Sequence, residues 1–466
     1  ANTLGPDTHS GRGTVNRARK HLTEAATRFQ SLGLAYEAGY ALNYRGVSYL
    51  EAGEREQARA DFTQALDLFR SAHDPPAQAL SLQSLALLSY EDGGLGDAMR
   101  EFDQALALIT RDQEPANYAH TLHNSALPLR VLGRFDEAME RYLEAGNILR
   151  SLGDRDGEAR ALHGLGTTLK YVGEPERARD FLRAAAQLRS ESGANRERAI
   201  TLIVLGQIER DAGNSAAALA LHREASSLVD APRDRARIHL AIAQDFIAAG
   251  ELSKARAELE TVLQLDLPET HRHLGMALTE LAVIDAHDGD MSTANSLFAR
   301  AIAVHTANGS EFELARTLYR RAEAHMRTDD SQSVLSDTTA ALKLFDAIGL
   351  HGTQAEGRAS FRATYRDVTE LQIFALVTEA AAAKDLGDPA GSQRLARAAL
   401  IASDRVKARM LIDAYASVRE SDAVTNQEIA RRRKIYETIV GKRQRREDLL
   451  ETGSPDAREL AALSKD

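Results

Sequence analysis

The side chains with the clearest capacity for chemistry are cations and imidazoles that recur every 40 residues. Arg130, Lys170 and Arg210 form one such series, and His123 and His163 form a second. Cations at fixed spacing can bind carboxylates or phosphates through charge-assisted hydrogen bonds. The sequence offers no catalytic set beside them, because it has no Cys and shows no Ser-His-Asp, phosphate-loop or paired-carboxylate pattern. We therefore expect a binding protein without catalytic residues, cofactor or metal.

The spacing of 40 residues comes from a repeat that fills most of the chain. Each unit has an anchor Gly, a small residue seven positions earlier, Ala five and twelve positions later, and an aromatic, Leu or His nine positions later. The regular anchors are Gly53, Gly93, Gly133, Gly173 and Gly213. Gly250, Gly289 and a degenerate Asp329 continue the series with slightly changed spacing. Self-similarity at a fixed period is the signature of stacked structural repeats.

Each unit reads as two helices. Apolar residues at i, i+3, i+4 and i+7 flank every anchor, and Gly at the anchor can end the first helix in a left-handed conformation. The small residues allow the two helices to approach closely. We predict an all-α fold, a right-handed superhelical solenoid of about eight helix pairs followed by a non-repeat helical segment.

These columns resemble the tetratricopeptide repeat (TPR), an antiparallel helix pair with small residues at the crossing and Ala-aromatic-Ala along the second helix. The period exceeds the usual 34 residues of that family. The longer unit is similar to the repeats of kinesin light chains and of bacterial peptide-sensing regulators. The resemblance implies a protein-interaction role and leaves the ligand open.

The 40-residue rhythm stops near residue 350. The order of "FRATYRDVTELQIFAL", "ASDRVKARMLIDAYA" and a charged helical stretch resembles the regulatory region of bacterial proteins that carry a caspase-like CHAT peptidase domain. The resemblance implies that partner binding is relayed to a C-terminal peptidase domain in cis, whose catalytic residues would lie after Asp466. It leaves two alternatives open, a self-contained adaptor that binds an acidic peptide tail and a scaffold that contacts nucleic acid.

We expect five segments from this pattern. They are a flexible N-terminal segment (1–14), a half-repeat or capping helix (15–34), the repeat array (35–350), a non-repeat helical pair (351–418) and a basic helical segment (419–466) that leads to the further domain.

A partner would bind along the first helices, which line the concave face of such arrays. Four positions of each first helix should face this groove. In the middle units they hold mainly cationic and polar side chains: His120, His123, Arg130, Arg160, His163, Thr167, Lys170, Gln207 and Arg210. This set favours an acidic protein or peptide ligand. Stabilisation of the helix C-terminus by a nearby cation offers a simpler reason for Arg130, Lys170 and Arg210.

The first two units present a more apolar surface at the same positions, formed by Tyr40, Asn43, Gln83, Leu87 and Tyr90. It would bind a hydrophobic segment, pack on a neighbouring domain or serve as the ordinary end of the array. Near the C-terminus, two basic runs would supply any nucleic-acid contact: Arg431, Arg432, Arg433 and Lys434, then Arg443, Arg445 and Arg446. The net charge of −10 argues against extensive nucleic-acid binding. No apolar stretch is long enough for a membrane span, and we expect a cytoplasmic protein.

The groove hypothesis predicts that reversing the charges of Arg130, Lys170 and Arg210 together abolishes partner capture, which a pull-down from the native cell extract measures. Removal of residues 425–466 should weaken binding only if the partner is a nucleic acid, with an affinity that falls steeply in salt. Unchanged capture by the charge-reversed chain would contradict the groove assignment.

Overall fold

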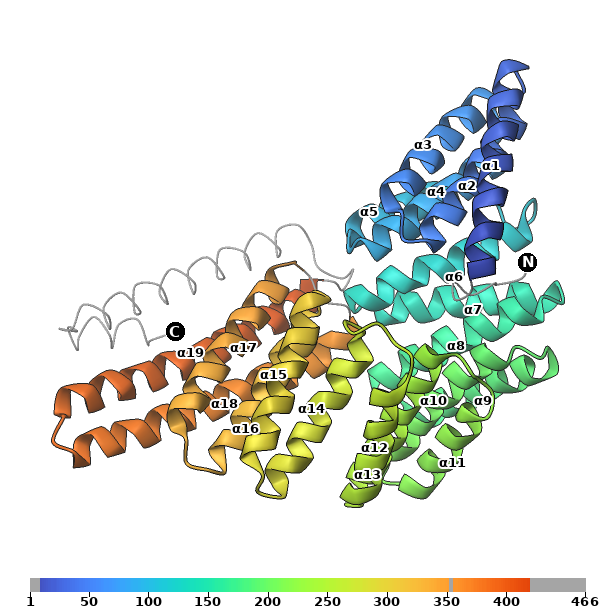
Figure 1. The fold of residues 1–466 in the computed structure, drawn as a ribbon. Helices are drawn as coiled ribbons and strands as arrows, with labels where there is room; N and C mark the ends of the chain where they lie inside the picture. The colour runs from blue at the N-terminus through green and yellow to red at the C-terminus, as the bar shows by residue number, and fades with distance from the viewer. Residues whose placement is uncertain (1–8, 352–354, 420–466) are drawn as a thin grey trace. The chain divides into compact units, whose positions relative to one another are not determined.

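Each unit of the repeat forms two antiparallel helices joined by a tight turn at the anchor residue. The computed structural model describes residues 9–351 and 355–419, which form nineteen helices and no strand. The eight predicted pairs are confirmed (Figure 1). They are α2 (Ala35–Glu51) with α3 (Arg55–Ser71), α4 (Pro75–Glu91) with α5 (Leu95–Leu108), α6 (Pro115–Leu132) with α7 (Phe135–Ser151), α8 (Arg155–Val172) with α9 (Pro175–Glu191), α10 (Asn195–Asp211) with α11 (Ser215–Ser226), α12 (Pro232–Ala248) with α13 (Leu252–Gln264), α14 (Arg272–His287) with α15 (Met291–Ala307), and α16 (Glu311–Met326) with α17 (Ser331–His351).

Three further helices lie outside the pairs. The first, α1 (His9–Ser31), packs on α2, where Arg19 Nε donates to Ser48 Oγ at 2.9 Å, and Arg19 also forms a 2.7 Å ion pair with Glu54 at the start of α3. It begins at His9, inside the segment that the sequence analysis assigns to a flexible terminus. The long helices α18 (Ala355–Asp385) and α19 (Pro389–Arg419) follow the last pair. The basic segment 420–466 lies outside the described residues.

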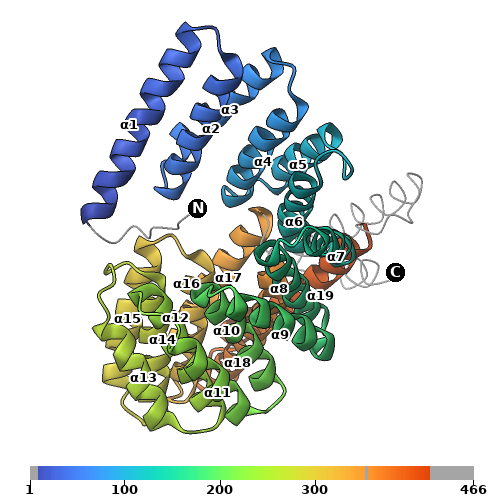
Figure 2. The same ribbon diagram turned by 90° about the vertical axis from the view of Figure 1, so that its right-hand side faces the viewer.

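The chain divides into two compact units. Among the described residues, one comprises 9–229 with 355–356, and the other comprises 230–351 with 357–419. Within each unit, consecutive helices lie side by side in chain order (Figure 2). None of the described helices carries an apolar stretch that could cross a bilayer.

The anchor residues adopt the backbone conformation that the sequence predicts. The seven anchor glycines have φ between 74° and 90°, and Asp329, the degenerate anchor, has φ 56°. Residues with a Cβ rarely adopt this left-handed region, whereas Gly does so without strain. Pro75, Pro115 and Pro232 begin first helices, and Pro175 begins the second helix α9 after the anchor Gly173. The first turn of a helix tolerates Pro because its N–H groups have no partner within the helix.

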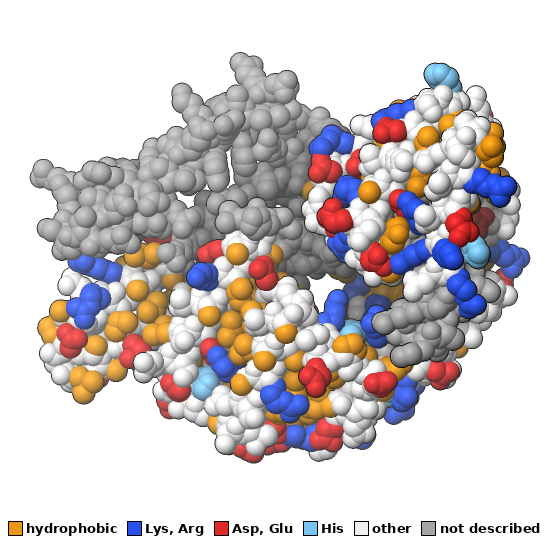
Figure 3. Space-filling view, turned by 45° about the horizontal axis from the view of Figure 1, so that its top comes forward, with side chains coloured by type: hydrophobic (Ala, Val, Ile, Leu, Met, Phe, Trp, Pro, Cys, Tyr) orange, Lys and Arg blue, Asp and Glu red, His pale blue; other side chains and the backbone are white. Residues whose placement is uncertain are grey.

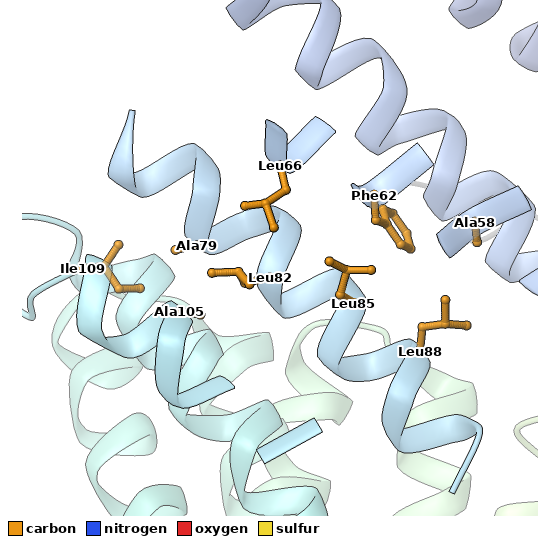
Figure 4. Packing of buried hydrophobic residues seen from close by; sticks show 9 residues of the cluster. All are labelled: Ala58, Phe62, Leu66, Ala79, Leu82, Leu85, Leu88, Ala105 and Ile109. Atoms are coloured by element: carbon orange, nitrogen blue, oxygen red, sulfur yellow. The ribbon is translucent and has the colours of Figure 1, made fainter. Parts of the chain in front are cut away.

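Small residues allow the two helices of a pair to touch. A Cβ added to Gly46 would lie 2.6 Å from Cε1 of Phe62, and one added to Gly166 would lie 2.6 Å from Cγ of Leu182. The second-helix side chain therefore occupies the space directly over the first-helix backbone. In the first unit of the chain, Phe62 and Leu66 of α3 continue this packing onto Leu82, Leu85 and Leu88 of α4 (Figure 4).

This close contact predicts opposite effects of the same substitution at two helical glycines. Gly46→Ala should lower the free energy of unfolding by roughly 1–3 kcal/mol, because the methyl group overlaps the Phe62 ring. Gly96→Ala is the matched control. Its Cβ would meet only Nη1 of Arg100 at 3.9 Å, so it should raise stability by up to about 1 kcal/mol. Urea unfolding followed by circular dichroism measures both, and equal stability of the two variants would contradict this packing.

Candidate anion-binding face

The predicted groove residues belong to a stripe along the first helices α6, α8 and α10, which contact one another in chain order. Two contacts join neighbouring first helices across it: His163 Nδ1 lies 3.2 Å from Thr201 Oγ1, and Lys170 Nζ donates to Gln207 Oε1 at 2.8 Å. Thr167 is 9 % exposed and donates to the carbonyl of His163, so it supports the helix more than it faces a ligand. We call this stripe the first-helix face.

His123 lies at the centre of a positively charged cluster on this face. Burial is the main cause that lowers its pKa to about 3, and Arg160, His120, Arg189 and Arg130 lower it further. Its ring packs 5.3 Å from the ring of Tyr142, centroid to centroid. Its Nδ1 is buried and has no hydrogen-bond partner among the described residues. The site therefore holds a neutral imidazole in a strongly positive environment.

Arg189 reaches this cluster from a second helix, α9, and was missed by the sequence analysis. It is 5 % exposed and donates through Nη1 to the carbonyl of Glu197 and to Thr201 Oγ1. Its buried Nε makes no hydrogen bond to any described residue. A signal was present, because the position sixteen residues after the other four regular anchors is a buried apolar residue: Phe69, Ile109, Leu149 and Val229. A cation in a core column is costly to bury unless it has partners.

Two carboxylates contact the rim of the cluster. His120 Nε2 lies 3.3 Å from Asp154 Oδ2, and Arg160 Nε lies 3.2 Å from Asp156 Oδ2. Burial and the charge of Arg160 lower the pKa of His120 in spite of both aspartates. Asp154 is also engaged as the N-cap of α8, where it accepts from the Gly157 amide at 2.9 Å. The cluster thus keeps its positive character.

The cations near the helix ends have neighbours of their own. The guanidinium of Arg130 lies 5.9 Å from the centre of the Tyr171 ring. Burial raises the pKa of Tyr142 to about 12, although Arg130 acts in the opposite direction. Burial lowers the pKa of Lys170, and Arg210 adds to this effect. Arg130 and Lys170 are partly buried against aromatic and polar neighbours, which dipole stabilisation alone does not require.

The predicted apolar groove of the first two units is less open than expected. Asn43 and Gln83 are 3 % and 7 % exposed, and they hydrogen-bond to Ser81 and Asn117. They hold neighbouring first helices together and offer little surface to a partner. Tyr40, Leu87 and Tyr90 keep partial exposure. Burial raises the pKa of both tyrosines, and Tyr40 packs 5.1 Å from the Phe69 ring, so this region is a half-buried aromatic end of the array.

The remaining predictions concern the basic C-terminal runs and metal binding. The basic runs at 431–434 and 442–446 lie outside the described residues. Acidic and basic side chains alternate over the face seen in Figure 3 and form no continuous field of either sign. Where the structure describes the chain, no group of three or more His, Cys, Asp or Glu could hold a metal ion.

Comparison with known proteins defines the class of fold. Residues 117–191, which carry most of the cluster, match the family model of the tetratricopeptide repeat. The structure is similar to the apo form of the quorum sensor NprR from B. thuringiensis, with a TM-score of 0.52 and 14 % identity over 71 % of this chain and 99 % of that one. The molecule is therefore a helical-repeat solenoid of the tetratricopeptide type.

Two further structures are similar over a smaller share of the chain. The apo form of RapI has a TM-score of 0.46 and 16 % identity over 58 % of this chain and 99 % of that one. BtubC (BKLC) from P. vanneervenii has a TM-score of 0.41 and 21 % identity over 45 % and 90 %. A search of curated proteins found no match. The resemblance to CHAT regulatory regions stays a prediction from the sequence.

The depressed pKa of His123 predicts a loss of stability in acid. Between its ordinary value of 6.5 and about 3, the unfolded chain binds a proton that the folded chain does not. The free energy of unfolding therefore falls as pH falls through this range, by up to about 1.4 kcal/mol per pH unit for one such group. In His123→Phe the free energy of unfolding should therefore fall less steeply between pH 6.5 and 5, because the unfolded variant binds one proton fewer. Urea unfolding at each pH measures this dependence.

The matched control for this prediction is His21→Gln, because the His21 ring is exposed and lies outside the cluster. In this variant the free energy of unfolding should depend on pH as it does in the parent protein. The same pH dependence in His123→Phe would contradict the neutral state of His123.

Proposed function

We propose that this chain binds a partner polypeptide along the first-helix face of α6, α8 and α10, and that an acidic group of the partner occupies the cluster around His123. One observation carries the proposal: His123 Nδ1 and Arg189 Nε are both buried without a hydrogen-bond partner among the described residues, in a strongly positive environment. A carboxylate or a phosphate would accept from Arg189 Nε, and from His123 Nδ1 in the tautomer that carries its proton on that nitrogen.

The energetics favour a ligand at this place. A buried polar group that lacks its hydrogen bond costs about 1–3 kcal/mol, and more when it is charged. A bound anion would recover part of this cost, and it would also favour protonation of His120, because an opposite charge stabilises the imidazolium. Affinity for an acidic partner should therefore rise as pH falls from 7.5 toward 6, while the fold itself is still stable.

The family resemblance extends this proposal to regulation. Binding at the first-helix face would be relayed through α18 and α19 to a peptidase domain of CHAT type. Arrays of stacked repeats suit such a relay, because each repeat contacts only its neighbours and small changes in packing add along the array. A self-contained adaptor would use the same face without the relay. Intact mass of the native polypeptide in its own cell extract separates these two forms of the proposal.

Fluorescence anisotropy of a labelled octaglutamate peptide tests the binding face. The net charge of −10 repels such a peptide in general, so saturable binding requires a local cationic site. We expect octaglutamate to bind and octaglutamine not to bind. Arg160→Glu should weaken octaglutamate at least tenfold, because it removes one cation and adds a negative charge beside His123.

The control variant is Arg155→Glu on the same helix. Arg155 is 64 % exposed and pairs with Glu191 at 2.6 Å, away from His123. It should bind octaglutamate within about twofold of the parent, since a rim charge contributes little. Equal losses in the two variants would show that only the general charge of the chain matters, and this result would overturn the assignment of the site.

A further inference from the structure

A second site is indicated by a carboxylate that lacks the basic partner found beside the corresponding carboxylates of other repeats. Four repeats place an acidic residue eight positions after the anchor, on the second helix: Asp61, Glu101, Glu258 and Asp337. Because the repeats share one architecture, these four side chains occupy corresponding places. They can be compared within one molecule.

In three of these repeats the first helix supplies a basic partner. Arg45, eight residues before its anchor, donates to both oxygens of Asp61 at 2.7 and 2.6 Å. Arg321, at the same position of the last repeat, donates to both oxygens of Asp337 at 2.8 and 2.6 Å. In the sixth repeat His239, eleven residues before the anchor, lies 2.6 Å from Glu258.

In the second repeat both of these first-helix positions are leucines. Leu85 corresponds to Arg45 and Arg321, and Leu82 corresponds to His239. Glu101 consequently has no basic partner from its own first helix. Its Oε2 is buried and makes no hydrogen bond to any residue that the structure describes. Burial raises the pKa of Glu101, although a side-chain hydrogen bond with Ser89 and the charges of Arg59 and Arg100 oppose this effect.

A cavity of about 450 Å³ lies beside Glu101, between α3, α4 and α5. Leu66, Leu82 and Leu85 provide its apolar lining and come from α3 and α4, as Figure 4 shows. The three arginines of its wall each have a carboxylate partner. Arg59 pairs with Asp92 at 3.0 Å, Arg70 pairs with Asp67 at 3.2 Å, and Arg100 pairs with Asp97. These three arginines pair with aspartates, and none of them forms an ion pair with Glu101.

We propose that this cavity binds the side chain of an arginine on a partner polypeptide, with its guanidinium on Glu101 and its aliphatic stem against Leu66, Leu82 and Leu85. The guest arginine would take the place that Arg45 and Arg321 fill in their own repeats. A planar guanidinium can donate to both oxygens of a carboxylate, as those two arginines do. The site involves the second helices and is separate from the first-helix face.

Methyl NMR of leucine-labelled protein tests this site with Nα-acetyl-arginine amide as the probe. We expect saturable shifts of the Leu82 and Leu85 methyl signals, assigned through single Leu→Ile variants. Nα-acetyl-citrulline amide, which has nearly the same shape without the charge, should bind at least tenfold more weakly. Equal shifts with both probes, or no shift with the arginine probe, would overturn the proposal.

Two variants locate the interaction. Glu101→Gln should weaken the arginine probe at least tenfold, whereas the exposed Glu140→Gln on α7 should leave its affinity unchanged. Leu85→Arg should restore the pairing seen in the first and last repeats, raise the thermal unfolding midpoint and abolish probe binding. If Leu85→Arg does not fold, the test rests on Glu101→Gln. Unchanged affinity of folded Glu101→Gln protein for the arginine probe would refute the site.

Discussion

The contact on which the rest of the structure depends is the close approach between the two helices of each repeat. The residue nine positions after the anchor lies directly over the small residue seven positions before it, as Phe62 lies over Gly46. This contact fixes the axial position of each second helix against its first helix. Repeated at constant spacing, it places neighbouring first helices side by side with a small axial offset, and the His163–Thr201 and Lys170–Gln207 contacts join residues 38 and 37 positions apart.

On this regular frame, the candidate sites arise where the charge pattern departs from that of the other repeats. Arg189 stands in a column that is apolar in the other four regular repeats, and its buried guanidinium adds a positive charge to a patch of histidines and arginines. Glu101 stands in a column whose other carboxylates have basic partners, while its own first helix offers leucines. Each departure leaves a buried polar atom without a partner among the described residues, a costly arrangement that a ligand of opposite charge relieves.

Much of the fold could be predicted from the sequence because the repeat carries its own register. The anchor column located every turn, and Asp329 was placed correctly although it is not Gly, since its φ is 56°. His163 and Gln207 each contact a neighbouring first helix, whereas their role in a groove stays a prediction. Burial was harder to predict, because it depends on the neighbouring repeat: Asn43 and Gln83 were expected on an open surface and instead bond to Ser81 and Asn117. Arg189 was missed because side chains of second helices were not expected to reach the first-helix face.

Hydrogen–deuterium exchange of the chain with and without a saturating acidic peptide tests the central claim most directly, because it locates the ligand on the molecule. The account predicts slower exchange in α6, α8 and α10 around His123, with little change in α12 to α16. Protection confined to α12 to α16, or no protection in α6, α8 and α10, would contradict an acidic partner bound on the first-helix face.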